Sequence, residues 1–218
     1  YHGQSYPGVP LGYQDMVGRV TYNYDYRYLL EFNIGRNGSE NFPKNHRFGW
    51  FPAVSIGWIP TNESFVKRTL GSDILSYLKI RASYGEVGND KFGSARFMYY
   101  PSEYLNGSGL SGYGILGEDP KLYYGFYEGK AGNPNVTWER SKKADIAIES
   151  RFLKDQLNLT FNYFHEKRNN ILTKRNTIPS YISAVIQDTY NIGRVKNSGY
   201  EIEWGWKSDI RDFHYWIN

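Results

Sequence analysis

A run of aromatic side chains near the middle of the sequence could bind a flat ligand. The segment KLYYGFYEG holds Tyr123, Tyr124, Phe126 and Tyr127, inside a glycine-rich connection over residues 86–136. Aromatic rings can stack on sugar rings, and glycine lets a backbone approach a ligand closely. Connections of this length usually carry function or are disordered. Two interpretations remain open: contact with a ligand such as a carbohydrate, or packing of the connection against its neighbours.

Other chemistry finds little support in the residue pattern. The chain has no cysteine, and its four histidines are not spaced as in a zinc site. No nucleophile-elbow motif marks a hydrolase, and GEVGNDKFG lacks the Lys-Ser/Thr ending and following helix of a phosphate-binding loop. The formal charge of +4 is scattered along the chain and forms no basic stripe. We therefore expect no enzyme activity, cofactor, metal or nucleic-acid partner.

Charged residues alternate with apolar ones in a way that predicts β-strands. In residues 143–152, Ala144, Ile146 and Ile148 alternate with Asp145 and Glu149. Successive side chains of a strand point to opposite faces, so one face is apolar and the other charged. In a soluble sandwich the apolar face would be core, whereas in a membrane β-barrel it would face lipid and the charges would line a wet lumen. The candidate lumen residues are Lys79, Arg81, Asp145, Glu149, Arg151, Glu201 and Glu203.

The same alternation predicts about eight strands, and opposite charges on neighbouring strands would help to hold their register. Proline cannot donate to a β-ladder, so we expect an edge or a bulge at Pro52. Helical spacing within residues 60–77 predicts a short helix that Thr61 or Asn62 could cap. The expected strands lie near residues 18–24, 28–34, 48–58, 78–86, 143–152, 157–166, 198–207 and 213–217.

Connection lengths favour a barrel over a sandwich. If the strands run up and down, all the short links fall at one end, together with the 60–77 connection. The short links lie near 25–27, 153–156 and 208–212. The long links near 37–47, 86–136 and 168–196 fall at the other. Outer-membrane barrels have this asymmetry, with short periplasmic turns and long extracellular loops. The 18% aromatic content also suits aromatic girdles. We predict an all-β fold, an antiparallel transmembrane β-barrel segment.

Five segments resemble a known family, in the family's order. They are similar to blocks from the C-terminal half of SusC/RagA-type TonB-dependent outer-membrane transporters. The resemblance implies a barrel of roughly 22 strands. Residues 1–218 would then be part of one such barrel domain, a fragment without the plug domain and remaining strands. The segments are GRVTYNYDYRYLLEFNIGRNGSENFPKNHRFGWFPAVSIGWIPTNESF, LKIRASYGEVGND, NPNVTWERSKKADIAIE, FNYFHEKRNNIL and NIGRVKNSGYEIEW.

The resemblance also implies a cellular setting. It points to the outer membrane of Bacteroidota, contact with outer-membrane lipid, and import of glycan or peptide cargo. It further implies a SusD-like surface lipoprotein as partner, and TonB as a partner through an N-terminal region absent here. If the resemblance holds, the four aromatic residues of KLYYGFYEG are candidates for cargo capture or for lipoprotein contact. The alternative is a soluble carbohydrate-binding or adhesin β-domain whose aromatic residues stack on sugars.

Overall fold

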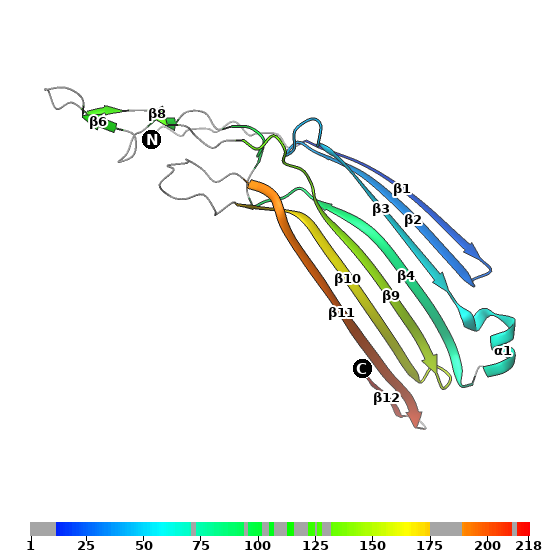
Figure 1. The fold of residues 1–218 in the computed structure, drawn as a ribbon. Coiled ribbons are helices and arrows are strands. Elements are labelled where there is room, and N and C mark those ends of the chain that lie inside the picture. The colour runs from blue at the N-terminus through cyan, green and yellow to red at the C-terminus, as the bar shows by residue number, and fades with distance from the viewer. Residues whose placement is uncertain are drawn as a thin grey trace.

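The computed structural model describes residues 12–70, 73–93, 96–101, 105–106, 113–115, 122–124, 126–127, 132–174, 189–210 and 213–218. Its main feature is one antiparallel sheet of eight strands, in the order β1-β2-β3-β4-β9-β10-β11-β12 (Figure 1). The predicted up-and-down arrangement is therefore confirmed. The strands are β1 (Tyr13–Tyr24), β2 (Tyr28–Ser39), β3 (Phe48–Trp58), β4 (Leu75–Asn89), β9 (Glu139–Phe152), β10 (Leu157–Lys174), β11 (Thr189–Ile210) and β12 (Phe213–Ile217).

The connections are sorted as the sequence predicts. The turn between β1 and β2, the turn between β9 and β10, and the link between β3 and β4 lie at one end of the sheet (Figure 1). We call this the short-turn end. The strand pairs β2 and β3, β4 and β9, and β10 and β11 are joined at the opposite end, which we call the long-loop end. The β3–β4 link contains a 3₁₀ helix, η1 (Pro60–Asn62), and a helix, α1 (Ser64–Leu70).

The first hairpin shows how local sequence sets a turn. Asp25 and Tyr26 both have a φ of 50°, and the Arg27 amide donates to the Tyr24 carbonyl at 2.9 Å. Two central residues with positive φ match the right-handed twist of the flanking strands. The Asn23 side chain accepts a hydrogen bond from the Tyr26 amide at 2.9 Å and stabilises the turn further.

The structure tests two local expectations. The ladder between β2 and β3 runs through Pro52 without a register shift, so there is no bulge. The ladder between β3 and β4 begins only at Ala53, so Pro52 lies at a local edge of β3, where its missing amide interrupts no ladder. The predicted helix is present, but η1 has no side-chain cap. Asn62 Nδ2 donates to the Tyr26 carbonyl at 2.7 Å, and the Thr61 hydroxyl accepts from the Leu78 backbone amide at 3.2 Å.

The long β4–β9 connection contains two short ladders that alternation does not predict. They pair β5 (Leu105–Asn106) with β8 (Phe126–Tyr127), and β6 (Tyr113–Ile115) with β7 (Leu122–Tyr124). Strands of two or three residues are too short to show a period of two. These two pairings are therefore visible only in the backbone of the folded chain.

The apolar face of the sheet is exposed along its whole width. Strand register places the apolar residues of β1, β2, β3, β4, β9, β10 and β11 on a common face. Ile56 is 56% exposed, Ile146 53% and Tyr200 72%. A face of this extent belongs against another apolar phase, since soluble monomers rarely expose large apolar patches. One row across the sheet consists of Tyr22, Leu30, Ile56, Ala82, Ile146, Tyr163 and Tyr200.

Within the described part of the chain, no helix has the length and apolar character needed to cross a membrane.

Candidate functional site: a charged sheet face and the base of the long connections

Four of the predicted lumen residues form one ion-pair network between β4 and β9. Arg81 lies opposite Ala147, so Asp145 and Glu149 flank it on the same face. Its Nη1 is 2.8 Å from Asp145 Oδ1, and its Nε is 2.8 Å from Glu149 Oε1. Lys79 Nζ lies 3.9 Å from the other oxygen of Glu149. Arg81 thus bridges two carboxylates on the face opposite the exposed apolar residues.

The other three predicted lumen residues lie outside this network. The Arg151 guanidinium sits 5.1 Å from the centre of the Tyr77 ring, in cation–π geometry. Glu201 accepts a hydrogen bond of 3.4 Å from Asn162 Nδ2. Glu203, on β11, lies opposite Thr160 of β10. The structure therefore brings together four members of the predicted set. That the face lines a lumen stays a prediction.

A hollow of about 590 Å³ lies beside the network. Small side chains, such as those of Ser55 and Ser83, leave room next to Arg81. On its far side, Arg19 Nη2 and Glu31 Oε2 form a second ion pair of 2.6 Å. The charged face is therefore partly hollowed, in contrast to the large side chains of the apolar face.

The aromatic residues of KLYYGFYEG lie on two short strands. Tyr123 and Tyr124 belong to β7, and Phe126 and Tyr127 belong to β8. The backbone of Tyr124 pairs with Tyr113, and that of Tyr127 with Leu105. Their side chains lie outside the described part of the structure. Their role in binding stays a prediction.

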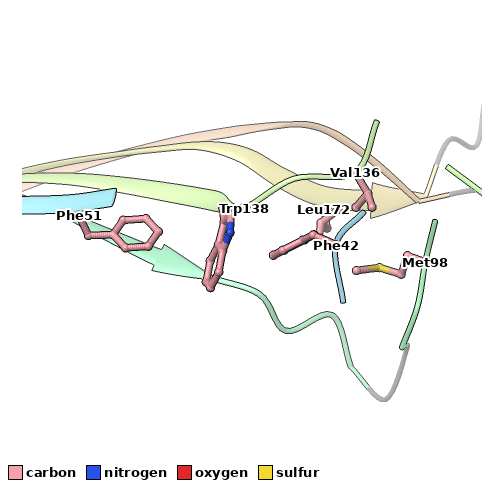
Figure 2. Close-up of a cluster of buried hydrophobic side chains, with 6 residues drawn as sticks. All are labelled: Phe42, Phe51, Met98, Val136, Trp138 and Leu172. Carbon is pink, nitrogen blue, oxygen red and sulfur yellow. The ribbon is translucent and has the colours of Figure 1, made fainter. Parts of the chain in front are cut away.

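Sequence analysis missed a buried cluster at the base of the long connections (Figure 2). We call it the loop-base cluster. Trp138 stands between Phe42 and Phe51, with ring centres 5.1 Å and 5.3 Å away. Its indole Nε1 donates to the Arg47 carbonyl at 3.2 Å. The members come from the β2–β3 and β4–β9 connections and from β3 and β10, and are Phe42, Phe51, Met98, Val136, Trp138 and Leu172.

Polar side chains join the same connections. Asn191 Nδ2 donates to the carbonyls of Thr137, at 2.7 Å, and Asn170, at 2.8 Å. Asn191 Oδ1 also accepts from the Thr137 amide at 2.9 Å. Nearby, Asn133 Nδ2 donates to the Thr189 carbonyl at 2.8 Å. These bonds tie the end of the β4–β9 connection to β10 and to the first residues of β11.

A third link joins the β2–β3 connection to the end of β4. The buried Ser39 hydroxyl donates to Asp90 Oδ2 at 2.6 Å, and the Asn41 amide donates to the Asp90 carbonyl at 3.3 Å. Buried polar groups are stable when they are paired in this way. The loop-base cluster and its polar links therefore hold together the bases of the β2–β3, β4–β9 and β10–β11 connections. No cluster of side chains suited to a metal ion occurs among the residues that the structure describes.

Comparison with known proteins identifies the family. Residues 13–217 match the family described as "TonB dependent receptor-like, beta-barrel". TonB-dependent receptor P3 of Formosa agariphila is 34% identical over 186 residues, which cover 85% of this chain. TonB-dependent receptor SusC of Bacteroides thetaiotaomicron is 30% identical over 186 residues, which cover 84%. The chain spans only 17% of the length of either relative.

Solved structures share the fold. The RagAB peptide importer in its "open-open" state has a TM-score of 0.73 at 23% identity, covering 94% of this chain and 20% of its own. The siderophore receptor PirA of Pseudomonas aeruginosa has a TM-score of 0.54 at 15% identity, covering 94% and 34%. The predicted resemblance and outer-membrane location are confirmed. This chain belongs to the TonB-dependent receptor β-barrel family, whose SusC-like and RagA-like members are proteins of the bacterial outer membrane.

Proposed function

We propose that this chain is a section of barrel wall in a receptor that imports nutrient oligomers, either glycans or peptides, across the outer membrane. One observation carries the proposal: an eight-stranded sheet with an exposed apolar face and with its long connections gathered at one end. A membrane barrel needs that outward apolar band, and its extracellular loops are its long ones. Family membership and the likeness to SusC and RagAB support the proposal.

The rest of the receptor supplies what a wall section cannot. We place residues 1–218 in a single barrel domain, closed by further strands and filled by a plug domain. Energy for import enters through TonB, which contacts the N-terminal region of the receptor. A SusD-like lipoprotein covers the extracellular mouth and presents the cargo. The names of the relatives, SusC on one side and a peptide importer on the other, support import of nutrients without separating glycans from peptides.

The charged face lines the wet interior of this barrel. Arg81 and its partners Asp145 and Glu149 would be costly against lipid, where a charge near the midplane destabilises a barrel by about 2 to 4 kcal/mol. The opposite face carries the exposed apolar rings and branched side chains. This assignment extends to Lys79, Arg151, Glu201 and Glu203, which share the face with Arg81.

The aromatic residues of β7 and β8 capture cargo at the extracellular mouth. They lie in the longest connection, whose base is held by the loop-base cluster. Each stacked ring contributes about 0.5 to 1.5 kcal/mol beyond its area burial, the scale seen for aromatic pairs. Loss of several rings should weaken binding tenfold or more, since about 1.4 kcal/mol is a factor of ten.

The test replaces Tyr123, Tyr124, Phe126 and Tyr127 by alanine in the intact receptor. A matched control changes the three tyrosines to phenylalanine, which removes hydroxyls and keeps the rings. Outer-membrane level, lipoprotein pairing, cargo affinity and growth on the cargo are measured for both. We expect at least a tenfold loss of affinity in the alanine variant alone. Unchanged affinity and growth would show that the rings only pack, and a failure of lipoprotein pairing would assign them to that partner.

A test of detergent dependence distinguishes the soluble carbohydrate-binding alternative from the barrel proposal. A soluble domain would have to cover the apolar face with a second layer, and within the described residues that face is open. We expect the receptor to need detergent or lipid to stay monodisperse. A monodisperse, detergent-free monomer would overturn the barrel proposal and favour the soluble one.

A further inference from the structure

The β3–β4 connection packs on the apolar side of the sheet at the short-turn end. Tyr24, Tyr28 and Trp58 lie in register on the apolar face. The Arg27 guanidinium lies over the Tyr24 ring, 5.5 Å from its centre, and its Nη1 donates to Glu63 Oε2 at 3.2 Å. Glu63 directly follows η1 and is only 7% exposed. The connection therefore bends outward, onto the face that meets lipid.

The charges in this connection restrict its depth in the membrane. Hydrogen bonds, first from the Tyr28 hydroxyl and then from Arg27, hold the pKa of the Glu63 carboxyl below its usual value. Glu63 is therefore ionised beside a cation. An ion pair of this kind on the lipid side is costly at the bilayer midplane and nearly free at the interface. The ion pair thus suits the headgroup level, where Tyr and Trp rings such as those of Tyr28 and Trp58 are also favoured.

Exposed apolar side chains extend beyond that row. Each described connection at the short-turn end presents at least one of them to its surroundings. Phe65, in the first turn of α1, is 61% exposed, and Ile74, just before β4, is also 61% exposed. The hairpin turns add Tyr26, 72% exposed, and Leu153, 44% exposed. We call these four residues the apolar collar. The α1 segment SFVKRTL also carries two cations and no acid.

We propose that the apolar collar rests in the phospholipid headgroup layer at the short-turn end, with α1 lying along the membrane surface as an interfacial anchor. Interfacial segments bury their apolar residues about 5 to 10 Å into the boundary between headgroups and acyl chains, and their cations attract anionic lipid. The collar adjoins the apolar face along the chain, since Tyr26 lies two residues before Tyr28 and the β3–β4 connection follows Trp58, and α1 supplies the cations. The proposal rests on the outer-membrane location and is independent of the cargo.

The test measures the depth of single labelled positions in the intact receptor. This chain has no cysteine, so single cysteines can be introduced in a cysteine-free receptor and labelled with an environment-sensitive fluorophore. The test positions are Phe65→Cys and Ile74→Cys. Ile146→Cys serves as the control on the spanning apolar face, and Asn158→Cys as the control at the same end on the charged face. The receptor is placed in nanodiscs of phosphatidylethanolamine and phosphatidylglycerol that carry a nitroxide either near the headgroup or near the acyl-chain end.

We expect the labels at Phe65 and Ile74 to lose fluorescence mainly to the shallow nitroxide, and the label at Ile146 mainly to the deep one. The label at Asn158 should respond to neither. If Phe65 and Ile74 behave like Asn158, the collar is in water and open to a protein partner, and the proposal is wrong. If they behave like Ile146, they belong to the spanning surface and the interfacial anchor is equally excluded. Neither result bears on import, because no cargo enters the measurement.

Discussion

Apolar side chains are exposed at the middle of the sheet and buried in the loop-base cluster. At the middle of the sheet, Ile56 and Ile146 remain more than half exposed although each is paired with a neighbouring strand on both sides. At the loop base, Phe42 is completely buried and Trp138 is only 5% exposed. The apolar side chains of the first region are open to contact with lipid. Those of the second region pack against one another in a core, as in a water-soluble protein.

The difference shows that one chain is built for two solvents. In lipid, an apolar side chain gains little from burial in protein, since acyl chains are as apolar as its neighbours. In water, burial drives folding at roughly 25 cal/mol per Å² of apolar surface. In the proposed receptor the long connections lie in water, where the loop-base cluster and its hydrogen bonds stabilise them. The comparison therefore makes predictions about which substitutions destabilise which region.

The largest effect is expected from Trp138→Ala. The change removes a buried ring packed between Phe42 and Phe51 and leaves a cavity, which costs about 3 to 5 kcal/mol for a large aromatic residue. The matched control is Trp50→Ala on the apolar face, where the ring is 48% exposed and lipid can fill the space. Denaturant unfolding and limited proteolysis of the long connections, both in the reconstituted receptor, measure the two effects. Equal losses would show that the two regions do not differ in solvent.

A charge on the apolar face should have the next largest effect. Ile146→Arg places a cation against lipid near the middle of β9 and should destabilise the folded receptor by about 2 to 4 kcal/mol. The control Asp145→Asn, one residue away on the charged face, should cost about 1 kcal/mol or less, since Arg81 keeps its bond to Glu149. Unfolding from lipid vesicles compares them. Similar costs would mean that the faces are assigned the wrong way round.

Loss of one polar link at the loop base should have a smaller effect. Asn191→Ala leaves the amide and carbonyl of Thr137 and the carbonyl of Asn170 without this partner, at a cost of about 1 kcal/mol. Asn197→Ala, an exposed position on the same strand, is the control. The sensitive readout is amide exchange at the start of β11 and the end of the β4–β9 connection. Unchanged protection there would show that the loop-base cluster holds the connections by itself.

The smallest effect concerns pH at the short-turn end. Because the pKa of Glu63 is lowered in the folded chain, its ionised form favours folding. This contribution is complete above its ordinary value of 4.5 and is lost as the pH falls through the lower folded-state pKa. The stability difference between wild type and Glu63→Gln should therefore shrink on acidification, as thermal unfolding across this range can show. A difference that grew instead would mean that burial of Glu63 outweighs its hydrogen bonds.

Much of the sheet could be predicted from the sequence because its causes are local. Alternation with a period of two identified the strands and their faces, as in Ile146 beside Asp145. The turns at 25–27 and 153–156 follow from short breaks between alternating segments. Sorting of the connections by length then indicated a barrel. Strand ends were less predictable: β11 begins at Thr189, well before the expected start near residue 198, since pairing with β10 continues beyond the clear alternation.

The set of strands, their two faces and the two unlike ends of the sheet can be predicted from the sequence. The folded structure alone shows which side chains meet. Phe42 and Trp138 are far apart in the chain, as are Arg81 and Asp145, and strand alternation carries no information about such contacts. It also decided that the apolar face is exposed, because the same alternation would serve a buried sandwich core or a lipid-facing wall. The physical reason is that alternation records only that the two faces differ, whereas contacts depend on how distant strands and connections come together.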